Sequence, residues 1–483
     1  MHIMILSIII CLACFIGVII SIITGKLNRA IASLVGAVIV YFTLIYIERL
    51  NFRVILDLLF GSESEGFVNL HSLILIIGML IIVEISKEAG LFQFFALSLI
   101  KLSKGKPVYL MSIFCLITIL ISAILNNILT VIILIPLTIT VSRILNINPS
   151  PYILTQAILV NIGGTFFTIS SIPNILISTY AGISFIQFFL NVGMLSLLIF
   201  ALTLIFFIFI YKNSLQVSES GVNILREFNV WNFVPDKRLM VKSLIILLIL
   251  FICFILIPST LISTDILALL LALILVIISR LDPRQIISKI DFELIFYLLG
   301  IFVIAGALDI LGVVQVLGQS MANLSGGDVY FQILIIVWFS SFLSSAIDNI
   351  PITKVLVPVI GTIAGNFPSN IGNQFYYSLA IGANWGDNLT PMGDNILVVQ
   401  LAESNKRPIS VKQFFKLGFI TTLYQLIIIS IYYTLIFSTS LGVLIIIIIF
   451  ISLLVIYLLS KFGPKKLRSI IKNATNRFRN IFI

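Results

Sequence analysis

The sequence predicts an all-α polytopic membrane protein made of two inverted repeats, each with a re-entrant helical hairpin and a broken transmembrane helix. Composition predicts the membrane class: of 483 residues, 60% are hydrophobic and 10% charged, and the mean hydropathy is +1.22. Apolar runs of about 20 residues, enough to cross a bilayer, recur from end to end. A transmembrane β-barrel would show short segments of alternating hydrophobicity instead. An internal similarity, described below, predicts the repeats.

Nine apolar runs are candidate spans. They cover residues 3–23, 28–47, 71–100, 188–211, 241–258, 261–279, 291–322, 412–436 and 440–460. No basic residue precedes the first run and no small-residue cleavage site follows it, so we expect a retained helix rather than a signal peptide. Two further regions, 107–180 and 329–403, are apolar but interrupted by Asn, Gly, Pro and Thr.

This pattern divides the chain into six segments. We expect N-terminal helices at 1–70, a first transport repeat at 71–211, a cytoplasmic connector at 212–242, linking helices at 243–290, a second transport repeat at 291–436, and a last helix with a basic cytoplasmic tail at 437–483.

The basic residues predict how the chain is oriented. Loop charges such as Lys26 and Arg29, between the first two spans, can all lie on one side, whereas the loop around Glu63 and Glu65 lies on the other. Since cytoplasmic loops carry an excess of Lys and Arg, we expect a multi-pass plasma-membrane protein with its N-terminus outside and its C-terminus in the cytoplasm. This orientation and the lipid bilayer account for the net charge of +10, so we expect no nucleic-acid partner.

Cysteine and histidine usage argues against a resident cofactor. All four cysteines lie in apolar runs, which is typical of small core residues, and the two histidines, His2 and His71, are far apart in the sequence. We therefore expect no cofactor and no His-based metal site, and only Na⁺ or H⁺ as a coupling ion.

Three sequence blocks recur in the same order at an offset of about 222 residues. The first copy holds GMLIIVEISKEAG (78–90), SAILNNILTVIILIP (122–136) and VNIGGTFFTISSIPNILIS (160–178). The second holds GIFVIAGALDILG (300–312), SAIDNIPITKVLVP (345–358) and ANWGDNLTPMGDNILVV (383–399). In the orientation above, one copy begins outside and the other inside. Inverted repeats of this kind are typical of secondary transporters.

Each copy predicts a polar hairpin tip and a later Gly- and Asn-rich helix break inside the membrane. Backbone exposed there must be satisfied by protein or water, so we expect the tips to line a cavity. Helix N-termini suit anions, while Asn, Thr and Asp oxygens suit cations. The candidate ion- and substrate-binding residues are Asn126, Asn127 and Thr130 at the first tip, Asp348, Asn349, Thr353 and Lys354 at the second, Asn161, Gly163 and Thr165 in the first break, and Asn384, Asp387, Asn388, Thr390 and Asp394 in the second.

The charged residues at the tips and breaks belong to the second copy only. Aligned with the first copy, Asp348, Asp387 and Lys354 stand opposite Leu125, Gly164 and Val131. An ionisable group costs about 2.5–3.5 kcal/mol at the centre of a membrane helix, which favours a functional role. Two structural alternatives remain: Lys354 pairs with one of the aspartates, or the asparagines only join neighbouring helices.

These paired blocks resemble the ion transporter superfamily, which includes arsenite permeases, sodium–proton antiporters of the same fold, and citrate and dicarboxylate symporters. The resemblance covers roughly 71–436. It implies elevator-like alternating access, a homodimer, and ion sites at the tips and breaks. We expect Asn127, Asn349, Asp348 and Asp387 to hold sodium. The Asp-Asn-Ile-Pro tip is closer to the arsenite-permease and antiporter branch than to the Ser-Asn-Thr tips of the symporters, so the family is defined better than the substrate.

The best-supported function is a secondary active transporter of a small ion, a proton- or sodium-coupled permease. The alternative is an anion permease for dicarboxylate, citrate or arsenite without proton coupling. A channel would need a continuous pore, which hairpins that each close one side argue against. An enzyme is not expected, because the sequence has no intramembrane aspartyl-protease motif, no His-Glu-x-x-His motif and no P-loop.

Overall fold

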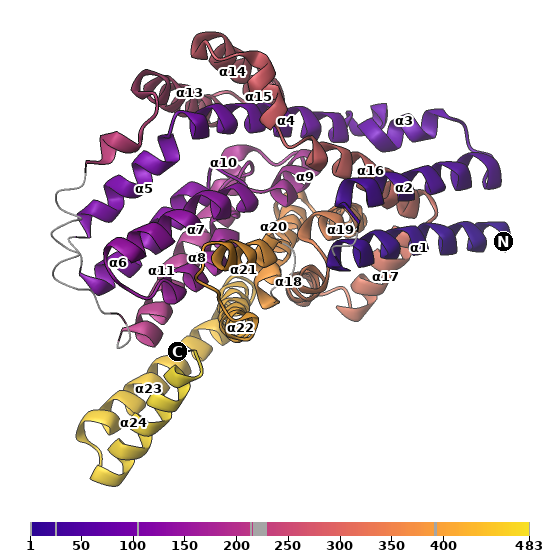
Figure 1. Ribbon diagram of the computed structural model, residues 1–483. Coiled ribbons are helices and arrows are strands. Elements are labelled where there is room, and N and C mark those ends of the chain that lie inside the picture. Colours follow the sequence, from indigo (N-terminus) through magenta and orange to yellow (C-terminus); the bar gives the residue numbers. More distant parts are fainter. Residues whose placement is uncertain are drawn as a thin grey trace.

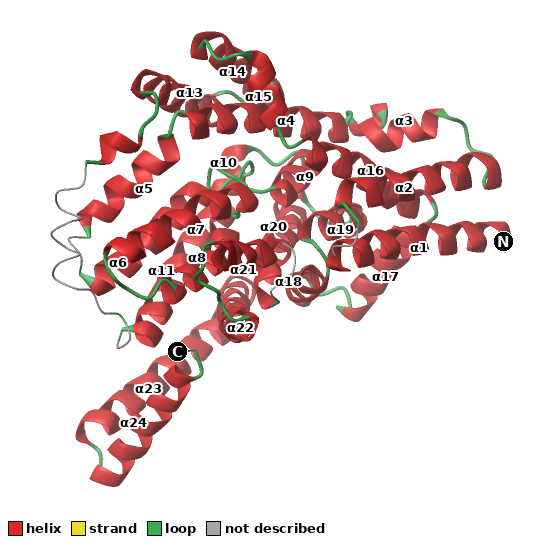
Figure 2. Cartoon of the chain, in the orientation of Figure 1, coloured by secondary structure: helices red, strands yellow, loops and turns green. Residues whose placement is uncertain are grey.

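The computed structural model describes residues 2–24, 27–103, 106–212, 215, 229–390 and 394–482. Within these residues every regular element is helical (Figure 2), and ten helices are long and apolar enough to cross a membrane. The predicted polytopic all-α fold is therefore confirmed. Residues 213–214 and 216–228 of the predicted connector, Pro391 to Gly393 of the second break, and the side chain of Asp394 lie outside the described part.

Two similar series of helices occur along the chain, and they differ in the short elements that follow the fifth helix (Figure 1). The first series is α4 (Val68–Glu88), α5 (Leu91–Leu102), α6 (Pro107–Ser122), α7 (Asn127–Ile144), α8 (Ser150–Gly163), α9 (Ile172–Ala181), α10 (Phe185–Phe188), η3 (Phe189–Gly193) and α11 (Met194–Tyr211). The second is α16 (Phe292–Ile310), α17 (Val313–Leu324), α18 (Val329–Ala346), α19 (Asn349–Ala364), α20 (Ser369–Gly386), η5 (Asp387–Leu389), α21 (Asp394–Ser404) and α22 (Val411–Phe437). This arrangement is compatible with the predicted repeats.

Two of the predicted spans are each two helices. The run 71–100 divides into α4 and α5 at Gly90, and the run 291–322 divides into α16 and α17 at Gly312. The two glycines have φ angles of 81° and 80°, a left-handed conformation that ends a helix and that glycine adopts without strain. Periodicity alone could not place these breaks because both sides of each glycine are apolar.

A pair of helices precedes each series and packs on the first helix of the other series. The helices α1 (His2–Thr24) and α2 (Arg29–Phe42) pack on α16, whereas α13 (Lys237–Leu256) and α14 (Thr264–Ser279) pack on α4. Glycines allow both contacts: a Cβ at Gly300 would lie 2.5 Å from Ser33, and one at Gly78 would lie 2.9 Å from Ala268. The backbones therefore touch, as is common between membrane helices.

Short elements and the C-terminal helices complete the chain. The short elements are η1 (Thr43–Ile47), α3 (Arg53–Phe60), η2 (Glu63–Glu65), η4 (Val230–Phe233) and α15 (Pro283–Lys289). The last helices, α23 (Thr439–Phe462) and α24 (Lys465–Asn480), extend from the body as a hairpin (Figure 1). The predicted basic tail is thus helical over the range of α24.

Candidate functional site

Each helical hairpin has a polar residue at its tip that caps the second helix. Between α6 and α7, the Asn126 side chain accepts a hydrogen bond of 2.9 Å from the Leu129 N–H. Between α18 and α19, the Asp348 carboxylate accepts one of 3.3 Å from the Ile350 N–H. Asn126 and Asp348 are therefore equivalent, and the alignment of Asp348 with Leu125 is wrong by one residue, because an N-cap fixes the register that the apolar flanks leave open.

The first helix of each hairpin packs tightly on the broken helix of its own series. Ser122 Oγ donates to the Val160 carbonyl and Ser344 Oγ to the Ala383 carbonyl, both at 2.6 Å. Close beside these bonds a glycine permits the approach: a Cβ at Gly386 would lie 2.2 Å from the Ser341 carbonyl oxygen. Hairpin and break are thus held together in the same way in both series.

An asparagine satisfies the backbone at each break. Asn174 Nδ2 donates to the Gly164 carbonyl at 2.7 Å, and Asn395 Nδ2 donates to the Asp387 carbonyl at 2.8 Å. A buried carbonyl that has lost its helical partner needs such a donor. The breaks are therefore stable irregular segments.

The first tip and the two breaks meet in one buried network. Asn127 Nδ2 donates to Asn161 Oδ1 at 2.6 Å, and Asn161 Nδ2 donates to Asn388 Oδ1 at 2.7 Å. Asn388 Nδ2 in turn reaches the Ile158 carbonyl at 2.9 Å. These three asparagines are at most 4% exposed. The structure thus brings together predicted residues that lie more than 200 positions apart.

A second set of bonds joins the breaks to each other. Asn384 Nδ2 donates to Asn174 Oδ1 at 2.9 Å, and the Trp385 indole N–H donates to Thr165 Oγ1 at 3.0 Å. Sequence reasoning did not include Asn174 among the site residues. Its counterpart in the second series, Asn395, lies in the matching sequence block and could have indicated it.

Among the buried oxygens without a hydrogen-bond partner, three belong to predicted site residues at the tips and breaks: Asn127 Oδ1, Thr353 Oγ1 and Asn384 Oδ1. A Cβ placed on Gly164 would lie 2.9 Å from Asn127 Oδ1, so this oxygen points at the first break. Buried oxygens of this kind are the ligands that hard cations prefer.

Carboxylates accompany these oxygens. Asp348 and Asp387 are 8% and 3% exposed. Among the described residues, no group of three or more His, Cys, Asp and Glu side chains could hold a metal ion. The donors near the tips and breaks are carboxylate, amide and hydroxyl oxygens, a set that fits an alkali cation or a proton better than a transition metal.

Other predicted site residues lie at the tips and breaks but outside this asparagine network. Thr130 Oγ1 bonds the Asn126 carbonyl within its own helix, and Thr390 Oγ1 bonds the Ser345 carbonyl. Lys354 and Asp348 line different cavities.

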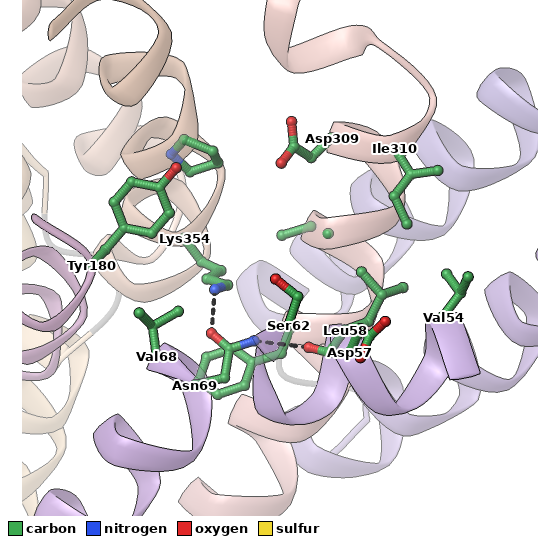
Figure 3. Close-up of a pocket in the computed structure, with 14 residues that line it drawn as sticks. Val54, Asp57, Leu58, Ser62, Val68, Asn69, Tyr180, Asp309, Ile310 and Lys354 are labelled. Carbon is green, nitrogen blue, oxygen red and sulfur yellow. Dashed lines mark hydrogen bonds between the residues drawn. The ribbon is translucent and has the colours of Figure 1, made fainter. Parts of the chain in front are cut away.

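Lys354 points into a cavity of about 260 Å³ between α3, α4, α16 and α19 (Figure 3). Its Nζ donates to Asn69 Oδ1 at 2.6 Å and lies 4.7 Å from the centre of the Phe302 ring. Asn69 is itself held by a bond of 2.8 Å to the Leu58 carbonyl. The lysine thus connects the second hairpin to the helices around it. Asp57 and Asp309 line the same cavity.

Asp348 lines a different cavity of about 430 Å³, together with Arg29 and Glu293. Arg29 also lines a small hollow with Asn126, Asn127 and Asn349, so it lies near both hairpin tips. The sequence marked Arg29 only as a loop charge. Its partner Glu293 is 264 residues further along the chain, so no local pattern could reveal this position.

Comparison with known proteins identifies the family. The sequence model described as "Citrate transporter" matches residues 19–382, most of the chain. The chain belongs to the citrate transporter family. This citrate-transporter-family protein is also 28% identical over 412 residues to a 46 kDa membrane protein of Mycobacterium leprae, covering 85% of this chain and 94% of that one.

Two further relatives of this family member include one that is named as a transporter. An uncharacterized transporter of Synechocystis is 25% identical over 87% of this chain and 96% of its own length. The P protein of Mus musculus is 25% identical over 73% of this chain but only 52% of its own length. These findings confirm the predicted resemblance and establish a membrane transporter rather than an enzyme.

Proposed function

We propose that this protein is a secondary active transporter that moves a small ion by coupling it to Na⁺, which binds where the hairpin tips meet the helix breaks. The observation that carries the proposal is the pair of buried, unpartnered amide oxygens, Asn127 Oδ1 and Asn384 Oδ1, beside this junction. Neutral amide oxygens bind a metal cation well and a proton poorly, which favours sodium. The buried carboxylates of Asp348 and Asp387 favour H⁺ as the second candidate.

Alternating access is the transport cycle we propose. Each hairpin is hydrogen-bonded to the broken helix of its own series, through Ser122 in the first and Ser344 in the second, which supports a unit of hairpins and breaks that moves as one body past the surrounding helices. The proposal includes an elevator-like movement, re-entrant hairpins, a homodimer, and a plasma-membrane orientation with the N-terminus outside and the C-terminus in the cytoplasm.

Proteoliposomes test the coupling. A pH-sensitive dye inside the vesicles and radioactive ²²Na⁺ outside report proton and sodium movement, while citrate, succinate, phosphate and arsenite are added one at a time. Asp348→Asn should abolish coupled flux. Asp328→Asn is a matched control, since Asp328 also caps a helix of the same hairpin, accepting from the Phe331 N–H at 3.0 Å, but at the end far from the tip.

The outcomes separate the candidates. Saturable sodium uptake that depends on an added solute, lost in Asp348→Asn but kept in Asp328→Asn, supports the proposal. If protons move instead of sodium, and this movement depends on the added solute and on Asp348 in the same way, then the coupling ion is H⁺ rather than Na⁺. Flux of an anion that follows only its own gradient supports an uncoupled permease, and unsaturable flux supports a channel.

A further inference from the structure

The last helix, α24, is basic and amphipathic. Over 16 residues it has no acidic side chain and carries the cations Lys465, Lys466, Arg468, Lys472, Arg477 and Arg479. Its apolar side chains recur with the spacing of a single helical face, at Leu467, Ile470, Ile471, Ala474 and Phe478. A helix with one apolar face and many Lys and Arg residues around the rest is typical of segments that lie on a membrane surface.

Protein covers only one flank of the apolar face of α24. Ile471 is half-buried, whereas Leu467 is 38% exposed and Ile470 is 57% exposed. Lys466, four residues before Ile470, and Arg477, seven residues after it, are exposed and border this uncovered apolar stripe. Long basic side chains in such a position can cover apolar surface with their stems while their charged ends reach lipid head groups.

The helix that precedes α24 brings it to a membrane surface. α23 ends at Phe462, and α24 begins at Lys465. α23 is long and apolar enough to cross the membrane, and of its 24 residues only Gly442 is buried. A chain that leaves such a helix emerges among the lipid head groups, and the cations of α24 oppose its return into the hydrocarbon. The head groups are therefore the surface that lies next to the uncovered stripe.

The C-terminal turn of α24 is fixed to α11. The centre of the Phe478 ring lies 6.5 Å from that of Phe206, and the Phe206 ring in turn stacks on Tyr424 of α22 at 5.0 Å. The guanidinium carbon of Arg479 lies 4.6 Å from the centre of the Phe209 ring. One end of α24 thus follows α23, and the other end is attached where α11 contacts α22.

Arg479 indicates a ligand independently of the apolar stripe. Its Nε is buried and has no hydrogen-bond partner, although the guanidinium lies over the Phe209 ring. A buried N–H normally has an acceptor, and α24 itself has no acidic side chain to supply one. A phosphate oxygen is an acceptor that suits the planar guanidinium well.

We propose that α24 is a lipid-binding helix whose apolar stripe enters the bilayer interface, whose cations bind the phosphate groups of anionic lipids, and whose Arg479 holds one such phosphate beside α11. Charge complementarity supports this partner, because each Lys or Arg near an anionic leaflet strengthens the attachment of a helix to it. The inference goes beyond the proposed function and does not depend on which ion is transported. It connects the lipid composition of the membrane with the contact between α11 and α22.

A fluorescent label on the apolar stripe tests the contact with the membrane. In the full-length chain with its four native cysteines replaced by alanine, Ile470→Cys carries an environment-sensitive fluorophore. Asn476→Cys carries the same label on the opposite, exposed face. The proteins are reconstituted into phosphatidylcholine vesicles with increasing shares of phosphatidylglycerol. We expect the label at position 470 to become several-fold less accessible to the neutral quencher acrylamide as the anionic lipid increases, while the label at position 476 stays accessible.

Charge variants show whether the cations are responsible. The test variant replaces three exposed cations of α24, as Lys466→Gln/Lys472→Gln/Arg477→Gln. It should raise the share of phosphatidylglycerol at half-maximal protection several-fold, and molar salt should act likewise, because the Debye length is then only about 3 Å. The control replaces three exposed cations at the ends of α13, α14 and α15, as Arg238→Gln/Arg280→Gln/Arg284→Gln, and should leave this share unchanged.

Two outcomes of the labelling experiment overturn the lipid-binding helix. Protection of position 470 that is the same with and without phosphatidylglycerol excludes anionic lipid as the partner. Protection that follows the ratio of protein to lipid instead of the lipid composition shows that a second copy of the chain covers the stripe.

Arg479 tests the phosphate beside α11. Arg479→Gln and Arg477→Gln remove the same charge from positions two residues apart. Thermal unfolding of each variant in lipid nanodiscs with and without phosphatidylglycerol measures the stabilisation by anionic lipid, and comparing each variant with itself removes the contribution of the Phe209 contact. We expect Arg479→Gln to lose most of this stabilisation and Arg477→Gln only a small part. Equal losses would mean that no phosphate is held at Arg479, and that part of the proposal would be wrong.

Discussion

Gln425 Nε2 donates a hydrogen bond of 3.2 Å to Thr203 Oγ1, a residue 222 positions earlier in the chain, which is close to the offset of about 222 residues between the repeated sequence blocks. The neighbouring residues repeat the relationship: Tyr424 bonds the Leu202 carbonyl, again 222 residues away. A residue that touches its own counterpart lies close to an axis relating two copies. The contact between α11 and α22 is therefore where a two-fold relation between the series is expected to pass.

The close approach at Gly386 predicts a severe substitution. Gly386→Ala would place a methyl group 2.2 Å from the Ser341 carbonyl oxygen, which is backbone and cannot rotate away. We expect a loss of about 3 kcal/mol or more in the free energy of unfolding. Thermal unfolding in detergent measures it. The control is Gly17→Ala, where no atom lies within 4 Å and the better helix propensity of alanine should leave stability equal or higher. If the two variants were equally stable, α18 and α20 would have to lie further apart than the close approach at Gly386 requires.

The equivalent hydrogen bonds of Ser122 and Ser344 predict that the two serines contribute similarly to the free energy of unfolding. Ser122→Ala and Ser344→Ala each remove a bond of 2.6 Å from hairpin to broken helix. Each should lower the free energy of unfolding by about 0.5–1.5 kcal/mol, and the double variant by the sum. The measurement is equilibrium unfolding of the three variants. Thr118→Val serves for comparison, because the Thr118 hydroxyl donates to the Phe114 carbonyl of its own helix. Removing this hydroxyl should lower the free energy of unfolding by less than either serine substitution. Strongly unequal serine effects would contradict an equivalent role.

Lys354 allows the structural and transport roles of an intramembrane charge to be separated. Lys354→Met removes the donor to Asn69 and the contact with Phe302, which should reduce stability by about 1–3 kcal/mol. Asn69→Ala should cost more, since it also removes the bond to the Leu58 carbonyl. Thermal unfolding and proteoliposome flux are measured together. Wild-type stability with lost flux in Lys354→Met would assign the lysine to transport rather than packing.

Single cysteines test the orientation. In a chain whose four native cysteines are replaced by alanine, Ser64→Cys should react with a membrane-impermeant maleimide in intact cells, whereas Lys472→Cys should react only after the membrane is permeabilised. The reason is the excess of basic residues near α24 and the acidic loop around Ser64. If Lys472→Cys reacted in intact cells and Ser64→Cys reacted only after permeabilisation, the orientation would be the opposite of the predicted one.

The sequence was sufficient for features that rest on local chemistry. Apolar length predicted the membrane class, and polar interruptions marked the tips and breaks that Asn126, Asp348 and Asn161 occupy. It was insufficient where partners are distant: Arg29 meets Glu293 only because α2 packs on α16, and Asn174 joins the site only because the breaks cross. Lys354 and the tip aspartate are close in sequence, yet they line separate cavities: Asp348 caps the start of α19, whereas Lys354 lies within the helix.

The exchanged packing of the leading helix pairs has a consequence for assembly. The helices α1 and α2 pack on α16, while α13 and α14 pack on α4. Each half of the chain therefore contributes a helix pair that packs on the other half. In the terms used for oligomers, the molecule corresponds to a domain-swapped dimer whose two subunits have been fused into one polypeptide. A chain divided within the connector should consequently yield no folded half alone, and two halves produced together should find each other and assemble.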